Sequence, residues 1–434
     1  MGTNWRRPAF LILAVTAITA AAAFLNSKLT RYVESAEFRA EMEKETARGL
    51  HFPGSKFGPI RRTGMLSAGS ASFRAQDGRK AMTSLDAHDI AGRFNPLGIF
   101  LRRWQLDELH IARGEVGIQV YEPKPEPTPT KPWYHVFLPD RVYLKRVWSD
   151  PADITWQMRG APGGIFGTHL EITPHGRDFN YRAIGGTLKN ALVPDLPLRE
   201  ARLRITKELF TLCTLDLSSD AGSIHGAGTA ETRGDKRADF KINWDKLPVR
   251  EWVPESWKGN FAGAAAGELH WTGGLKLEAA KIEGASRISG GRLSQLPFLE
   301  QLAAVTQRAD FARLELNECA ADVTWDKGRG TLQNIALEDR GKFRIEGTVS
   351  FAEESLGGTI ELGLGRPYLA WLPKAEELFP RERDGYLWTT VHLSGTLAAP
   401  EQDLSPRLVE ALKETPFSFF GAAFRALGAW LRGD

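Results

Sequence analysis

The residues from Ala321 to Gly395 alternate between apolar and polar side chains in a series of short segments. In one segment Phe343, Ile345 and Val349 alternate with charged or hydroxyl-bearing residues. Because successive side chains of a β-strand point to opposite faces, this period of two predicts strands with one apolar face. The expected product is an antiparallel sheet that is apolar on one face and polar on the other.

A similar pattern occurs about 120 residues earlier in the chain. Gly228–Ala230 corresponds to Gly347–Val349, and Trp252–Pro254 corresponds to Trp371–Pro373. An ordered series of correspondences at one offset indicates an internal repeat. The sequence therefore predicts two copies of one β unit, at residues 200–273 and 320–400, with an insertion at 274–319 between them.

Helices are predicted at only a few places in the remaining chain. Residues 27–50 have the composition of a polar helix, and a short helix is expected in the insertion after Ser294, with Phe298, Leu302 and Val305 on one face. Between them, further strands are predicted at 65–76, 80–91, 104–112, 114–121, 141–148, 153–159, 168–173 and 178–184.

The first 30 residues contain an uncharged run from Pro8 to Leu25 that follows Arg6 and Arg7. A run of this length is just sufficient to span a bilayer, and the preceding arginines favour a cytoplasmic N-terminus. We expect an uncleaved anchor; a cleavable signal peptide is the alternative, because Ala20–Ala23 offers small residues for processing. The main apolar residues of the predicted anchor are Pro8, Phe10, Leu11, Ile12, Leu13, Val15, Ile18, Phe24 and Leu25.

The C-terminal segment, residues 401–434, has the spacing of an amphipathic helix. One interpretation is a helix that packs on the sheet, and the other is contact with a membrane or a partner helix. The stripe consists of Phe417, Phe420, Phe424, Leu427 and Leu431.

Composition and charge exclude several classes of function. The net charge of +3, from 56 basic and 53 acidic residues, lacks the excess of basic residues typical of nucleic-acid-binding proteins. The nine histidines are scattered, without the spacing of a metal pair, and no phosphate-binding glycine loop or nucleophile elbow is present. Cys213 and Cys319 are far apart and are expected to be unpaired, buried thiols; a disulfide between them is the alternative in an oxidising compartment. We therefore expect neither an enzyme nor a cofactor.

Three segments of the chain resemble the C-terminal module of AsmA-like proteins. They are Gly290–Leu299 with the short helix that follows, Phe343–Val349, and Ser394–Pro400, which is similar to the family's closing "G-T-L-x-x-P". The resemblance is clearest over residues 240–405. It implies a protein anchored in the bacterial inner membrane, with its body in the periplasm and a role in outer-membrane biogenesis. It also implies a relation to bridge-like lipid-transfer proteins, which fold as a long, curled β-sheet with an apolar trough for phospholipid acyl chains.

Together these observations predict a mainly β protein with an elongated, curled antiparallel sheet that forms an open groove. The expected segments are the cytoplasmic tip and anchor (1–30), an N-terminal helix and β-groove segment (31–199), the two repeats, the insertion, and the C-terminal helix. The residues expected to line the groove are Val323, Trp325, Phe343, Ile345, Val349, Ile360, Leu362 and Leu364.

Periodicity alone does not distinguish such a groove from a closed sandwich or barrel, in which the same residues form an ordinary core. The alternative function is therefore a structural or interaction protein of the cell envelope. Its partners would bind the proline-rich segment 122–132 or the C-terminal helix. An outer-membrane barrel is disfavoured by the anchor and by the charged strand faces.

Overall fold

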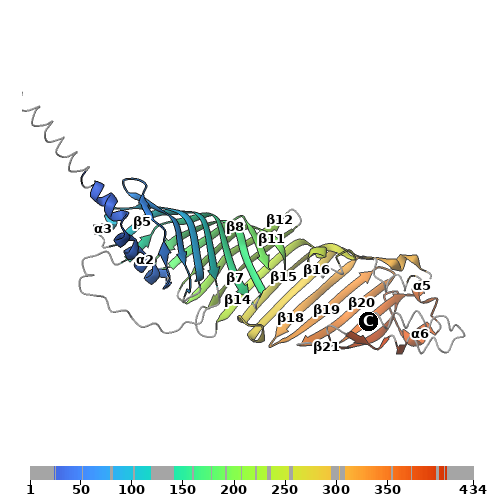
Figure 1. Cartoon of the computed structure of the whole chain (residues 1–434). Coiled ribbons are helices and arrows are strands. Elements are labelled where there is room, and N and C mark those ends of the chain that lie inside the picture. Colours follow the sequence, from blue (N-terminus) through green and yellow to red (C-terminus); the bar gives the residue numbers. More distant parts are fainter. Residues whose placement is uncertain are drawn as a thin grey trace, which may run out of the picture. The chain divides into compact units, whose positions relative to one another are not determined.

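The computed structural model of the chain shows a mainly β protein with few helices (Figure 1). The chain divides into two compact units between Thr206 and Lys207, close to the expected start of the first repeat at residue 200. The structure describes residues 24, 26–50, 52–78, 82–100, 103–118, 141–158, 161–176, 178–190, 193–206, 208–219, 222–231, 236–253, 258–294, 303, 308–352, 355–372, 374–396, 400–404 and 406–407.

Unit 1 begins with helical residues and continues as a sheet. Its elements are α2 (Ala36–Leu50), β1 (Lys56–Phe57), β2 (Ile60–Arg62), β3 (Ser67–Ala75), β4 (Met82–Phe94), α3 (Leu97–Phe100), β5 (Arg103–Ile118), β6 (Arg141–Leu144), β7 (Val147–Met158), β8 (Ala161–His175), β9 (Asp178–Ile184), β10 (Thr187–Asn190) and β11 (Val193–Ile205).

Unit 2 is a second run of mainly long strands with short helical connections. The first part comprises β12 (Leu209–Ser219), β13 (Gly222–Glu231), β14 (Arg237–Pro248), η2 (Val249–Glu251), β15 (Phe261–Gly274), η4 (Leu277–Ala279), β16 (Ala280–Ser294), η5 (Ala309–Ala312), β17 (Arg313–Leu316) and β18 (Glu318–Asp326). The second part comprises β19 (Arg329–Asp339), β20 (Phe343–Ala352), β21 (Ser355–Gly365), α5 (Arg366–Leu369), α6 (Ala375–Leu378), β22 (Arg381–Arg383), β23 (Tyr386–Gly395) and β24 (Pro400–Gln402).

The strand pairings of unit 1 are antiparallel except around β5. This strand pairs in parallel with β6 and with β7. A parallel pair requires a long crossover connection, and residues 119–140, which include the proline-rich segment, provide that length. The expectation of a wholly antiparallel sheet was therefore wrong at this crossover.

Two strands differ from the pattern expected from sequence. The predicted strands at 104–112 and 114–121 are parts of β5, because Gly114 continues the ladder opposite Ala87 instead of turning the chain. The insertion at 274–319 contains β16, which pairs with β15 on one side and with β18 on the other. The insertion thus adds a full strand to the sheet, and its Gly- and Ser-rich sequence obscured this.

The two predicted repeats share an irregularity at the same place. The β12–β13 ladder shifts register between Leu212 and Leu215, and the β19–β20 ladder shifts between Leu332 and Ile335. A β-bulge bends the strand that contains it, so the two copies have the same local distortion. By this register Gly226, two residues before the position matched by sequence, takes the place of Gly347.

The core of unit 1 lies between α2 and the first strands. Ser35 begins the helix, because its Oγ accepts a 3.1 Å hydrogen bond from the N–H of Phe38. Phe52, which follows the helix, is fully buried and packs with Phe73 and Ala87 on β3 and β4. The end of α2 therefore packs on the apolar face of the first strands through Leu50.

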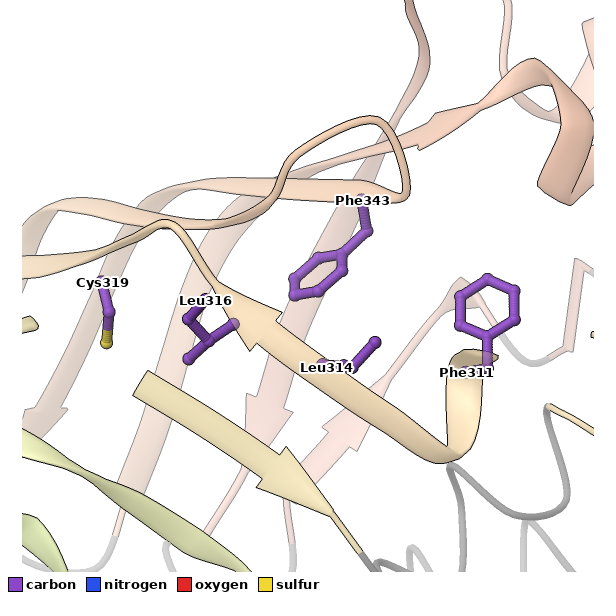
Figure 2. Close-up of a cluster of buried hydrophobic side chains, with 5 residues drawn as sticks. All are labelled: Phe311, Leu314, Leu316, Cys319 and Phe343. Atoms are coloured by element: carbon purple, nitrogen blue, oxygen red, sulfur yellow. The ribbon is translucent and has the colours of Figure 1, made fainter. Parts of the chain in front are cut away.

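Unit 2 has two core clusters near the ends of its strands. One contains Phe311, Leu314, Leu316, Cys319 and Phe343, which converge from η5, β17, β18 and β20 (Figure 2). The second is built by α5, α6 and the residues that follow them. Its buried members are Leu369, Leu372, Phe379 and Leu387.

Four sequence predictions fall largely or wholly outside the described residues, and the proline-rich segment 122–132 is one of them. Of the anchor run only Phe24 is described, and of the helix after Ser294 only Ala303, which packs against the Phe343 cluster. The stripe from Phe417 to Leu431 lies wholly outside. None of the helices in the described ranges combines the length and apolar character that crossing a bilayer requires.

Candidate functional site

The apolar face of unit 2 contains two continuous rows of side chains that cross its strands. Each residue of a row pairs directly with the next, so all of them lie on one face of the sheet. The aromatic row consists of Leu212, Gly228, Phe240, Trp271, Ile282, Trp325, Gly330, Phe351 and Leu356. The aliphatic row consists of Leu215, Gly226, Ile242, Leu269, Gly284, Val323, Leu332, Val349, Gly358 and Leu393.

Side chains in both rows are incompletely covered. Every non-glycine residue of the two rows is half-buried, and none is fully buried. None of these residues belongs to a core cluster in the part of the chain that the structure describes. In a closed sandwich the inner faces of two sheets interdigitate and their central residues lose their exposure. The central apolar face of unit 2 therefore retains accessible surface.

Among the described residues, the core clusters that cover this face lie at one end of the strands. Residues 308–317 contribute to the Phe343 cluster at that end, and residues 366–372 and 374–385 contribute to the second cluster. At the opposite end the strands are joined by short turns, such as residues 327–328 between β18 and β19. The aromatic and aliphatic rows lie towards the short turns, and this is the accessible part of the face.

The eight residues predicted to line a groove all lie on the apolar face, but in two environments. Phe343 is buried, and Ile345, Leu362 and Leu364 pack against the core clusters. Ile360 is half-buried and pairs with Val391. Val323, Trp325 and Val349 belong to the accessible rows. The predicted residues therefore fall into those that pack in or against the core clusters and those that retain accessible surface.

Aromatic residues and glycines alternate across neighbouring strands of this face. Phe240 pairs with Gly228, Trp244 with Gly267, and Phe351 with Gly330. A Cβ on Gly330 would clash first with the Phe351 ring, whereas a Cβ on Gly228 or Gly267 would clash with a backbone carbonyl as well as with the partner ring. The rings therefore lie over the glycines of the neighbouring strand.

The two tryptophans of the aromatic row have their polar atoms satisfied at the short-turn end. Trp271 Nε1 donates to the carbonyl of Gly274 at 3.0 Å, and Trp325 Nε1 donates to the carbonyl of Leu277 at 2.8 Å. An indole held in this way presents only its apolar ring to the face. Neither tryptophan offers a free donor that would orient a polar ligand.

The opposite face of unit 2 is polar and is cross-linked by ion pairs. Glu346 accepts hydrogen bonds from Arg344 at 2.7 Å and from Arg383 at 2.5 Å. Burial raises the pKa of Glu346, but these two guanidinium groups outweigh it and hold the pKa below its usual value. Such a network stabilises the charged face.

Two histidines of this face lie beside carboxylates. His270 Nε2 lies 2.8 Å from Asp239 Oδ1, and His225 Nδ1 lies 3.6 Å from Asp216 Oδ1. Within the described ranges no group of three or more potential metal ligands comes together. Cys213 and Cys319 are both free thiols, as expected, but only Cys319 is buried; the expectation that Cys213 is buried was wrong, because it lies exposed on β12.

Sequence reasoning missed more than half of the accessible rows. It did not select Phe240, Trp271 and Ile282, because they lie in the first repeat and the insertion. The internal repeat was the available signal, since Phe240 and Phe351 lie in the same row on strands of the two copies. The pairing of β16 with β18, which joins the rows of the two copies, required the structure.

Comparisons with known proteins found no match: no family model, no curated protein and no solved structure is similar to this chain.

Proposed function

We propose that the chain is a non-enzymatic protein that binds or conducts phospholipid along the apolar face of unit 2. The observation that carries this proposal is the pair of accessible rows. They combine a continuous apolar surface with an absence of polar groups that would orient a water-soluble ligand. Acyl chains are the natural complement of such a surface, because covering it gains about 25 cal/mol per Å² of apolar area.

The dimensions of the aliphatic row support an occupant longer than one side chain. The row crosses ten strands, from Leu215 on β12 to Leu393 on β23. At about 4.8 Å between neighbouring strands, this distance is about 40 Å. The acyl layer of one bilayer leaflet is about 15 Å thick, half of a hydrocarbon core of about 30 Å. The row is therefore long enough for more than one lipid tail laid end to end.

The cellular setting of the proposal comes from the sequence. The apolar run Pro8–Leu25 after Arg6 and Arg7, and the resemblance of residues 240–405 to AsmA-like proteins, support a single-pass anchor in the bacterial inner membrane. In this arrangement the cytoplasmic tip precedes the anchor and both units lie in the periplasm. The role is then in outer-membrane biogenesis, with phospholipid as the cargo and no cofactor.

Photocrosslinking in living cells tests the proposal. A photoreactive residue is placed at Val323 or Val349, in the accessible rows, and at Thr348 as a matched control. Thr348 is exposed and adjoins Val349, so its side chain lies on the polar face. The proposal predicts labelled phospholipid at Val323 and Val349 and none at Thr348. Labelling of protein alone at Val323 and Val349 supports the structural alternative instead.

A further inference from the structure

Unit 1 exposes a group of large apolar side chains around its N-terminal helical residues. We call this group the collar; it comes from the helical residues 24 and 26–33, the β2–β3 turn and α3. Met65 is 83% exposed, Leu97 63% and Phe24 62%. Single exposed apolar residues are common on proteins, but a contiguous group marks an interaction surface. The members of the collar are Phe24, Leu29, Tyr32, Met65, Leu66 and Leu97.

The collar is held in place by one arginine. Arg62 Nη1 donates to Asn26 Oδ1 at 2.6 Å and to Thr30 Oγ1 at 2.9 Å, and its Nη2 donates to the carbonyl of Met65 at 2.7 Å. The backbone N–H of Arg62 also donates to Glu34 Oε1 at 3.1 Å. These bonds tie the helical residues to the turn that carries Met65 and Leu66. The exposed side chains are therefore presented on a fixed backbone.

An apolar pocket of about 160 Å³ opens within the collar. Leu29 and Tyr32 line it from the helical residues, and Met65 and Leu66 line it from the turn. Phe38 closes its inner side and contacts the ring of Tyr32, with 5.4 Å between the ring centroids. The collar thus has both exposed apolar side chains and a pocket lined mainly by apolar side chains.

Basic residues predominate in the segments that form the collar, and the nearest acidic residue in the sequence, Glu34, accepts the backbone N–H of Arg62. Lys28 and Arg31 lie on the helical residues, and Lys56, Arg61 and Arg62 lie on β1 and β2. Residues 1–33 and 46–76 contain no Asp or Glu. Apolar residues flanked by cations are the composition of a surface that lies in the interface of an anionic bilayer. The apolar run that ends at Leu25 leads directly into this surface.

We infer that the collar is a membrane-docking surface, seated in the headgroup region of an anionic phospholipid bilayer at the end of the predicted anchor. This inference rests on the membrane attachment in the proposed function and adds the surface that fixes the orientation of unit 1. Met65 and Leu97 enter the acyl boundary, and the pocket receives the end of an acyl chain. Lys28, Arg31 and Arg61 contact lipid phosphates.

Spin-label accessibility in the full chain tests the inference. The protein carries Cys213→Ser, and a nitroxide is attached at M65C, at L97C or, as a control, at L275C. Leu275 is 43% exposed in the turn after β15, so its label is also on the surface. The protein is reconstituted into vesicles of phosphatidylethanolamine and phosphatidylglycerol. Collisions with oxygen, which concentrates in the bilayer, are compared with collisions with a water-soluble nickel chelate.

The expected result is that labels at residues 65 and 97 collide mainly with oxygen and the label at residue 275 mainly with nickel. Labels at 65 and 97 that are as accessible to nickel as the label at 275 overturn the inference. The result is independent of lipid in the rows of unit 2. A docked collar without crosslinked lipid at Val323 refutes only the proposed function, and crosslinked lipid with a water-exposed collar refutes only this inference.

Discussion

Trp325 on β18 donates a 2.8 Å hydrogen bond from its indole Nε1 to the backbone carbonyl of Leu277, in the turn between β15 and β16. The bond crosses β16 and fixes the ring over the apolar face at the centre of the aromatic row. The same tryptophan is thus a stabilising contact and part of the proposed lipid surface. Substitutions that separate the two roles are informative.

Trp325→Phe removes the hydrogen bond and keeps an aromatic ring in the row. We expect the free energy of unfolding to fall by about 1 kcal/mol, the usual net value of one hydrogen bond, with lipid binding retained. Urea denaturation measures the change. Trp252→Phe, at a 38% exposed tryptophan outside the rows, is the control and should have a smaller effect. An unchanged midpoint for Trp325→Phe contradicts the assigned role of the bond.

Gly330 leaves the space that the Phe351 ring occupies. Gly330→Ala should displace this ring and lower the free energy of unfolding by about 1–3 kcal/mol, as overpacking does elsewhere. The matched control is Gly259→Ala, because a Cβ at Gly259 meets no atom within 4 Å. Its effect should stay within about 0.5 kcal/mol. Equal effects of the two substitutions would show that the ring does not cover the glycine.

Arg62 connects the N-terminal helical residues to β2 and the Met65 turn. Arg62→Ala should loosen residues 26–34, because it removes several hydrogen bonds of a charged donor at once. Hydrogen exchange of these residues should accelerate severalfold, without a change in the strands of unit 2. Arg61→Ala, at the exposed neighbouring residue, serves as the control. Unaltered exchange in Arg62→Ala would show that the Arg62 hydrogen bonds do not hold residues 26–34 in place.

Cys319 lies in the Phe343 cluster, and burial raises the pKa of its thiol to about 11. The thiolate is the reactive form, so Cys319 should resist a thiol reagent at pH 8, whereas exposed Cys213 should react. Titration with a chromogenic disulfide should count one thiol in the native protein and both in urea. Rapid reaction of both thiols in the native protein would show that the cluster is open.

The sequence predicted the one-sided strands well, because alternation in segments such as Phe343–Val349 depends on local chemistry alone. It did not predict β16, because Gly284 and Ser286 occupy positions on the apolar face where an alternating strand would have apolar side chains. It also did not distinguish Ile345 from Val349. Both residues lie on the same face of β20, but among the described residues the Phe343 cluster packs against Ile345 and does not include Val349. Coverage by distant segments is not encoded in the periodicity of a strand.

The central claim is that the accessible rows hold phospholipid, and lipid analysis of the purified full chain tests it most directly. Wild type is compared with Val323→Lys/Val349→Lys, which places two charges in the rows, and with Thr348→Lys on the polar face. Circular dichroism confirms that all three proteins are folded. We predict that phospholipid co-purifies with wild type and Thr348→Lys and is lost from the double variant. Wild-type protein without phospholipid, or equal amounts in all three, would contradict the claim.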